Sequence, residues 1–219
     1  MCGKVEVTTT KGNEMSLHTR NITAVFRSAD ADLIAEGVEW YADARRVADA
    51  FAARYAVPVH VSAGVLAALS PLNSWGNNVN LAGRMLASGG TLERGYLKAN
   101  LAKARRIIAE GSTDALGGLK VNNFYRSIIT GGAEGVTIDR HAWCIAHNDR
   151  TRTNSIPKLT PKAYAEIAER YRRAALILSR EYGMPLSPAV VQAVTWVVWR
   201  RRYWGAGAFD TYNVEDIAA

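Results

Sequence analysis

An aspartate stands where a helix is expected to begin, at residue 139. Asp139 follows the apolar residues Val136 and Ile138, and Arg140, His141 and an apolar helical run come directly after it. A carboxylate at a helix N-terminus should be ionised and held in place by unpaired backbone N–H groups and the positive end of the helix dipole. Such a fixed charge can stabilise developing positive charge or orient a water molecule. The alternative is a capping residue with no part in chemistry.

Of the four histidines, His141 is the one closest in sequence to Asp139. His141 lies two residues after Asp139, so it could assist the same site or contact a phosphate, and the alternative is an ordinary, partly buried histidine. His141 and His147 are six residues apart and so face different sides of a helix. His18 and His60 have no partner signal, and we therefore predict no metal site.

Two adjacent glycines, Gly117 and Gly118, precede another expected helix. Glycine supplies backbone freedom and allows another backbone to approach closely. The helix that follows offers unpaired N–H groups and a positive dipole end to an anion. Lys120 adds a cation at the same place. The turn is therefore a candidate seat for a phosphate group.

Residues 116–122, LGGLKVN, carry a resemblance to a known hairpin. Together with the glycine-containing loop after them and Asp139, they resemble the helix-hairpin-helix DNA glycosylase superfamily, whose hairpin usually reads Leu-Pro-Gly-apolar-Gly-x-Lys and precedes a catalytic aspartate. Lys120 replaces the second hairpin glycine, and Asn122 stands where bifunctional members carry a Schiff-base lysine. The resemblance thus implies no lyase activity through that position. It also implies these DNA-binding residues: Gly117, Gly118, Leu119, Lys120 and Asn122.

A second part of the resemblance lies upstream, at Leu69-Ser70-Pro71-Leu72-Asn73. This segment is similar to the family's Leu-Ser-x-Gln stretch, which lends a residue to plug the gap left by an extruded base. Leu72 or Asn73 would be that plug here. Trp75 and Tyr125 are candidates for stacking on the base. The alternative for both aromatic residues is a place in the core. The polar residues between Leu69 and Trp75 have an alternative too, because helix capping or turn formation would equally explain them.

The resemblance implies an enzyme that binds double-stranded DNA, flips a base out and hydrolyses its N-glycosidic bond without a cofactor. Asp139 would stabilise the positive charge that develops on the deoxyribose. Two alternatives stay open. The superfamily includes virus-encoded branches thought to act on hypermodified thymine, so a same-fold enzyme could alter a base without excising it. A DNA-binding module that has lost catalysis is the other.

Composition and charge agree with a nucleic-acid partner but do not require one. The 219 residues carry a net charge of +7, which favours polyanions such as DNA or an acidic membrane surface. The two cysteines, Cys2 and Cys144, are too few for a disulfide framework. Some members of the resembled superfamily hold an iron-sulfur cluster in a C-terminal cysteine loop. No cysteine follows Cys144 here, so the resemblance implies no such cluster. We see no apolar run long enough to span a bilayer and no signal-peptide core, and we expect a cytoplasmic monomer.

Apolar spacing predicts an all-α protein that positions these residues on short loops. Residues 1–27 show little helical period and are expected to form an arm. Helices should begin near Asp30, Ser74, Thr160-Pro161 and Ser187-Pro188, because short polar residues and proline favour helix starts. The resemblance implies a two-lobed fold, in which residues 56–135 form a helical barrel with the hairpin. Residues 28–55 and 136–219 would form the second lobe, with Asp139 at the mouth of the cleft.

Overall fold

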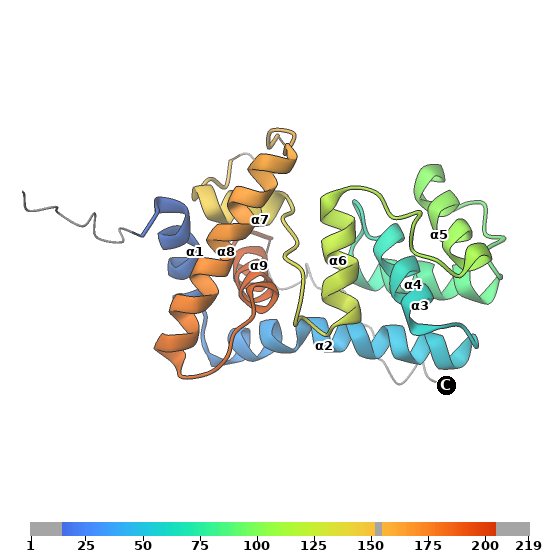
Figure 1. Cartoon of the computed structure of the whole chain (residues 1–219), viewed down its shortest axis with the longest axis horizontal. Coiled ribbons are helices and arrows are strands. Elements are labelled where there is room, and N and C mark those ends of the chain that lie inside the picture. The colour runs from blue at the N-terminus through green and yellow to red at the C-terminus, as the bar shows by residue number, and fades with distance from the viewer. Residues whose placement is uncertain (1–14, 152–154, 205–219) are drawn as a thin grey trace, which may run out of the picture.

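A computed structural model describes residues 15–151 and 155–204, and its regular elements there are nine helices and no strand (Figure 1). The all-α class predicted from the sequence is confirmed for these residues. None of these helices is long and apolar enough to cross a membrane. The helices are α1 (Leu17–Arg27), α2 (Ala31–Arg54), α3 (Val59–Leu69), α4 (Trp75–Ala87), α5 (Lys98–Glu110), α6 (Leu119–Ile129), α7 (Arg140–His147), α8 (Pro161–Tyr182) and α9 (Pro188–Trp204).

Most helix starts follow from local side-chain chemistry. In five helices a short polar residue precedes the first turn and accepts a hydrogen bond from the backbone N–H three residues later, as an N-cap does. The caps predicted from the sequence are confirmed, including the one before α9. The capping residues are Ser16, Asp30, Ser74, Asp139 and Thr160, with Ser187 playing the same part for Val190.

The first described segment is a helix and not part of an arm. Residues 17–27, expected to lack helical structure, form α1, which packs on α7 and α8. Its polar composition conceals a narrow apolar stripe, in which Ile22 and Phe26 are fully buried. Tertiary packing of that stripe stabilises a helix whose sequence alone has a weak period. Residues 1–14 of the expected arm lie outside the described part of the chain.

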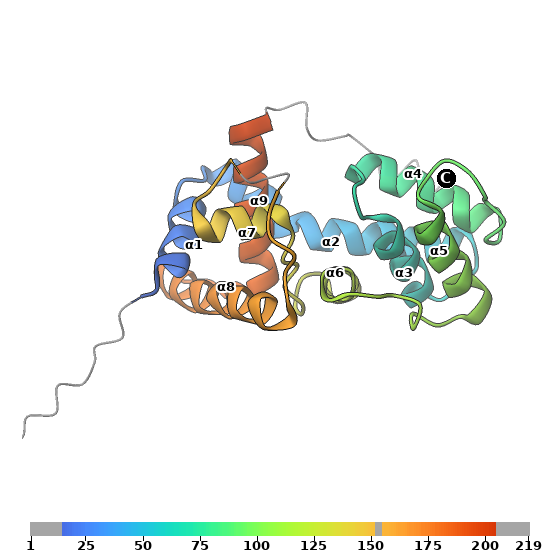
Figure 2. The ribbon, with the colours of Figure 1, turned by 90° about the horizontal axis from the view of Figure 1, so that it is seen from above.

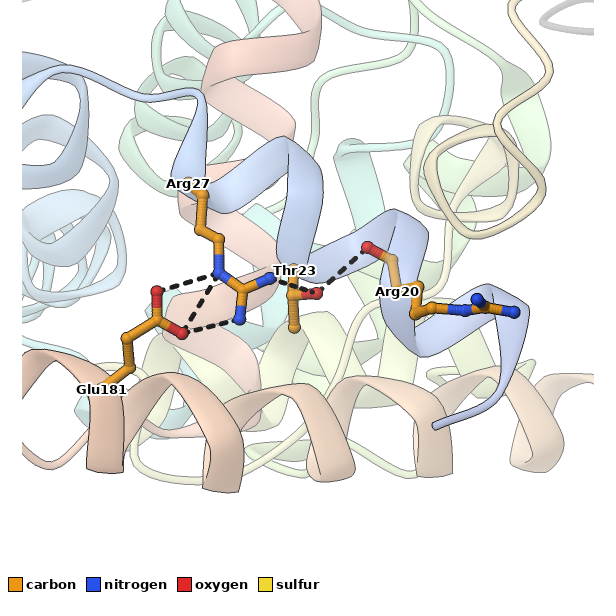
Figure 3. A network of polar contacts seen from close by, with 4 residues as sticks. All are labelled: Arg20, Thr23, Arg27 and Glu181. Carbon is orange, nitrogen blue, oxygen red and sulfur yellow. Dashed lines mark hydrogen bonds and ion pairs between the residues drawn. The ribbon is translucent and has the colours of Figure 1, made fainter. Parts of the chain in front are cut away.

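An ion pair joins the end of α1 to α8 (Figure 3). The Nη2 and Nε atoms of Arg27 donate to the carboxylate of Glu181, at 2.6 Å to Oε2 and 2.9 Å to Oε1. Thr23 donates its hydroxyl hydrogen to the carbonyl oxygen of Arg20 and accepts a weak contact from Arg27. Both side chains of the pair are about 40% exposed, so the pair contributes little to stability.

Two hydrophobic cores lie side by side, and α2 runs under both (Figures 1 and 2). The first lobe comprises α3 to α6, and the second comprises α1 and α7 to α9. Residues 28–55 were expected to belong to the second lobe alone. Instead α2 contributes five buried side chains to the first core, while its Leu33, Ile34 and Val38 contact the second. The five are Tyr41, Ala44, Val47, Ala48 and Phe51. At 24 residues, α2 is long enough to span both lobes.

The crossing of α2 and α9 fixes the second lobe against α2. A Cβ atom at Gly37 would lie 2.4 Å from the Cα of Val194, so the two backbones touch there and no larger residue fits. Around this contact α9 buries nearly every side chain, as its apolar sequence predicts. The crossing holds the middle of α9 beside the first third of α2, and Tyr41 and Gln192, one from each helix, share a hydrogen bond next to it.

Candidate functional site

A cavity of about 1040 Å³ lies between the two lobes. Residues from both lobes and from α2 line it, so its shape depends on the whole fold. Of the residues proposed from sequence, it brings together Leu72, Asn73, Trp75, Gly118, Leu119, Lys120, Asp139 and His141. The lining residues that were not among the proposed site residues are mainly Trp40, Tyr41, Asn78, Phe124, Thr137, Gln192, Trp196 and Arg200.

Asp139 is held at the cavity wall by its own helix. Its Oδ1 atom accepts a hydrogen bond of 2.8 Å from the backbone N–H of Ala142, in the first turn of α7. The predicted N-cap is therefore confirmed. The cap uses one of the two carboxylate oxygens, and the side chain is only partly buried. Capping and a role in chemistry are thus compatible in this residue.

Tyr164 of α8 positions the strand-like segment that leads into Asp139. Its hydroxyl donates to the carbonyl oxygen of Val136 at 2.7 Å and accepts from the backbone N–H of Ile138 at 3.1 Å. Burial raises the pKa of Tyr164 to about 12, so the hydroxyl keeps its proton at neutral pH. The backbone N–H of Val136 donates to Asn123 Oδ1 of α6. Both lobes therefore hold the residues immediately before Asp139.

His141 is buried beside Asp139, with 6% of its surface exposed. Burial lowers the pKa of His141, and although Asp139 opposes the shift, the positive charges of Arg140, Arg200 and Lys120 add to it. The imidazole is therefore neutral near pH 7. A neutral imidazole next to a carboxylate can accept a proton or orient a water molecule.

A buried polar network stands on the α2 and α9 side of the cavity. The hydroxyl of Tyr41 lies 2.9 Å from Gln192 Oε1 and 3.2 Å from Thr137 Oγ1. All three residues are buried, and burial raises the pKa of Tyr41 far above its ordinary value. The amide oxygen of Gln192 accepts the hydrogen of the Tyr41 hydroxyl. The amide nitrogen of Gln192 is therefore the group that can donate a hydrogen bond to a ligand in the cavity.

Aromatic side chains form much of the remaining wall. The ring centre of Trp40 lies 5.2 Å from that of Trp75, 6.0 Å from that of Phe124 and 5.9 Å from that of Trp196. The guanidinium carbon of Arg200 stands 4.8 Å from the centre of the Trp196 ring. Walls of this kind accept flat, apolar groups and tolerate a positive charge.

Tyr125, proposed from sequence beside Trp75, does not line the cavity. It packs against the first core, whereas the preceding residue, Phe124, faces the cavity. Successive residues of a helix point in directions about 100° apart, following from 3.6 residues per turn. Phe124 and Tyr125 are adjacent in sequence, but only Phe124 lines the cavity.

The bend between α3 and α4 presents a leucine to solvent. Leu72 has a φ of +62° and is 84% exposed, and it lies at the edge of the cavity. A leucine in the left-handed region is strained, and an exposed one loses the benefit of burial. The next residue, Asn73, donates its backbone N–H to the carbonyl oxygen of Ser70 and its amide to that of Leu69. Local bonds therefore hold the leucine outward.

The turn before α6 presents its backbone at the other side of the cavity. Gly118 precedes α6 with a φ of +81°, a conformation that favours glycine, and no side chain caps the helix there. Leu119 and Lys120 follow it and are exposed. Gly117 and Asn122 do not line the cavity. Asn122 turns its amide back to the carbonyl oxygen of Gly118, at 3.0 Å, and stabilises the turn.

Several arginines of α5 and α9 are engaged within the fold. Arg106 pairs with Glu110, and Arg201 pairs with Glu36. Arg202 donates to the Ser28 hydroxyl at 2.8 Å. These side chains are less available to a partner than Lys120, which lines the cavity.

Sequence signals for the missed residues exist but are weak. Gln192 is an isolated amide on a helix that is otherwise apolar, and a buried polar residue of that kind usually has a partner. Asn78 is one of three asparagines at the start of α4, and nothing in the sequence separates it from Asn77 and Asn80. Trp40 looks like an ordinary residue of the core face.

Comparison with known proteins adds a family and no activity. No curated protein and no solved structure matches the chain. One family model, described as "Family of unknown function (DUF7178)", matches residues 4–203. The match covers most of the 219 residues. The chain therefore belongs to the DUF7178 family.

Proposed function

We propose that the protein is a DNA-binding enzyme of the helix-hairpin-helix glycosylase type, which hydrolyses the N-glycosidic bond of an extruded base. The observation that carries the proposal is a convergence on one cavity. An anchored carboxylate and an uncapped glycine turn with a lysine line a cavity that aromatic rings also line, and an outward-held leucine stands at its edge. Each of these groups suits a different step of the reaction.

DNA would be held at the turn before α6. The unpaired N–H groups at the start of α6 and the charge of Lys120 suit a backbone phosphate, which needs both donors and positive charge. Leu72 lies at the edge of the same cavity and projects into solvent. An apolar side chain in that position can enter a base stack and fill the gap that an extruded base leaves.

The cavity suits the base itself. Trp40, Trp75 and Phe124 offer faces and edges on which a flat ring can stack. Such stacking repays part of the free energy that unstacking the duplex costs.

Asp139 and His141 suit the chemical step. Water attacks C1′ of the deoxyribose, the bond from C1′ to the base nitrogen breaks, and its electron pair leaves with the base. Positive charge builds on the sugar before the new bond is complete, and the Asp139 carboxylate would stabilise it. The neutral imidazole of His141 can accept a proton from the attacking water, and the departing base takes up a proton from solvent.

One observation favours a second candidate. The cavity volume lies at the upper end of the range for sites that enclose drug-sized ligands, so a base with a substituent also fits. The second candidate is an enzyme that alters a modified thymine without excising it. It would use the same cavity, with the duplex held in the same way.

Mass spectrometry of the reaction products tests both candidates. The protein is incubated with duplexes that carry differently modified bases, and nucleosides and free bases are then measured, with the Asp139→Asn variant as the control. A free base and an abasic site support the glycosylase. A nucleoside of changed mass supports modification. If DNA binds but neither product forms with any duplex, the protein binds DNA without catalysis and the proposal is wrong.

A further inference from the structure

A buried asparagine of the cavity wall has a polar atom that no described residue contacts through a hydrogen bond. Asn78 of α4 lines the cavity and is 1% exposed. Its amide nitrogen donates a hydrogen bond of 3.0 Å to the carbonyl oxygen of Leu66. Its amide oxygen, Oδ1, is buried and accepts no hydrogen bond from the described residues. Buried polar groups are rarely left in this state, because losing water without gaining a partner costs free energy.

The orientation of the Asn78 amide is determined by its neighbour. A carbonyl oxygen only accepts hydrogen bonds, so the amide nitrogen must face Leu66. Turning the amide by half a turn would place two acceptors against each other and leave the nitrogen without its partner. Oδ1 is therefore a fixed acceptor, and whatever satisfies it must bring a hydrogen-bond donor.

The surroundings of Asn78 specify the shape of that partner. Trp75 lies three residues earlier on α4 and so on the same face of the helix. Its ring is 5.2 Å from that of Trp40 and 6.2 Å from that of Phe124, which meets it edge-on. Asn78 and these three rings line the same cavity, so an occupant that reaches Oδ1 comes from within the cavity and lies against the rings. A flat molecule with a donor on its edge fits this description.

We propose that Asn78 determines which base the protein accepts, by taking a hydrogen bond from an N–H group on the edge of the extruded nucleobase. The identification of the occupant as a nucleobase rests on the proposed function. The ring N–H of a uracil-type base and the exocyclic amine of an adenine-type base both meet the requirement. A base that presents only acceptors to Asn78 leaves Oδ1 unsatisfied and is rejected.

The test measures binding and needs no turnover. Each duplex carries one target nucleotide opposite an abasic site, so pairing strength does not differ between bases. A fluorine at C2′ of that nucleotide disfavours positive charge on the sugar and so slows cleavage. Two pairs of bases are compared, uracil with 3-methyluracil and adenine with purine, because the second member of each pair lacks one N–H donor. Dissociation constants are taken from the change in tryptophan fluorescence as the cavity fills.

In the wild-type protein, the analogue without the donor should bind about tenfold more weakly in at least one pair, the effect expected when a buried acceptor loses its partner. In Asn78→Leu, which is similar in size and has no acceptor, both members of that pair should bind equally. Asn80→Leu, an exposed change on the same helix, should discriminate as the wild type does. A merely structural role for Asn78 would weaken both members alike and leave their ratio unchanged.

Two results would overturn the proposal: equal binding of both members of each pair to the wild type, or unchanged discrimination in Asn78→Leu. The comparison of the base pairs in the wild type needs no variant, so it tests the proposal even if Asn78→Leu does not fold. In that case Asn78→Ala serves as the second variant. Failure of the proposed function looks different. If the protein discriminates between donors through Asn78 but releases no base, the role of Asn78 stands and the glycosylase proposal is wrong. If it releases a base but does not discriminate between donors, the glycosylase proposal stands and the role of Asn78 is wrong.

Discussion

Tyr96 donates its hydroxyl hydrogen to the carbonyl oxygen of Pro71, the residue immediately before the exposed Leu72. Burial raises the pKa of Tyr96, so the hydroxyl remains a donor at neutral pH. Tyr96 belongs to the connection between α4 and α5 and is separated from Pro71 by 25 residues. The bond therefore ties the leucine bend to a second segment of the first lobe.

We expect Tyr96→Phe to weaken extrusion of a base from duplex DNA by about two- to tenfold, the usual effect of losing one hydrogen bond. Without this hydrogen bond the bend that carries Leu72 would be less well fixed, while the cavity itself would stay intact. Fluorescence of 2-aminopurine next to the target base reports the extrusion. Tyr125→Phe, a change on α6 outside the cavity, should have no effect. A Tyr96→Phe protein that extrudes bases as well as the wild type would show that the bond does not serve the leucine.

Asp139→Asn should lower turnover by at least about 100-fold, because the charge that stabilises the transition state is removed. Binding of DNA should be equal or stronger, since a carboxylate that faces phosphates repels them. Asparagine caps helices as well as aspartate does, so folding should not suffer. Single-turnover rates and binding titrations measure both effects.

Asp30→Asn is the matched control for that experiment. Asp30 caps α2 with the same geometry, its Oδ1 accepting from the backbone N–H of Leu33 at 2.8 Å, but it lies outside the cavity. The control should retain full turnover. Equal turnover in wild type and Asp139→Asn would leave capping as the only role of Asp139.

The buried His141 should make the fold less stable in acid. Its pKa is lowered in the folded state, so as pH falls below the ordinary value of 6.5 the unfolded chain takes up a proton before the folded one does. Stability is therefore lost as pH falls through that value towards the lowered pKa of the folded state. His18, whose pKa burial also lowers, adds to the loss in the same direction.

Urea unfolding between about pH 8 and pH 5 measures this dependence. His141→Asn should show a shallower loss of the free energy of unfolding with falling pH than the wild type, and His141→Asn with His18→Asn a shallower loss still. If the single variant has the wild-type slope, protonation of His141 is not linked to unfolding, and the neutral imidazole assigned to the site is wrong.

Lys120→Ala should weaken DNA binding similarly for all sequences and reduce the slope of log affinity against log salt by about one unit, as expected when one phosphate contact is lost. Folding should be unaffected because Lys120 is exposed. Arg172→Ala removes the same charge from an exposed ion pair on α8 and should keep the wild-type slope. Titration of one duplex at several salt concentrations compares the three proteins.

Gly118→Val should bind DNA still more weakly than Lys120→Ala. Gly118 has a φ of +81°, which strains any residue with a side chain, and a branched one would also stand between the backbone and a phosphate. The same salt titration, with thermal unfolding to check the fold, measures this effect. Normal binding by Gly118→Val, with a wild-type slope for Lys120→Ala, would mean that DNA is not held at this turn.

Borohydride should not trap a covalent adduct between the protein and DNA. Asn122, at the position of the family's Schiff-base lysine, cannot form an imine, and its amide faces the carbonyl oxygen of Gly118. Any excision should therefore leave an intact abasic site, visible by gel electrophoresis as a strand that breaks only on treatment with alkali. A trapped adduct would point to Lys120, the lysine that lines the cavity.

Local chemistry made part of this protein predictable from its sequence. The caps at Ser74, Asp139 and Thr160 depend on residues within one turn of the helix that they begin, so short-range patterns were enough to find them. The same holds for the turn at Gly118, because it depends on the backbone preference of a single residue. The helix α1 escaped prediction since its stability comes from contacts with α7 and α8.

The residues that line the cavity could not be predicted in the same way, because they come from segments that only folding brings together. Tyr41 and Gln192 share a hydrogen bond across 151 positions of the chain, and Trp40 reaches Trp75 and Trp196 on two other helices. A helix pattern shows which face is apolar but not which neighbour covers it, so Phe124 and Tyr125 could not be told apart. Sequence alone determined where Asp139 and Gly118 stand on their own elements. The crossing of α2 with α9 and the packing of two cores along α2 decided that they face one cavity, since that depends on side-chain contacts distant in sequence.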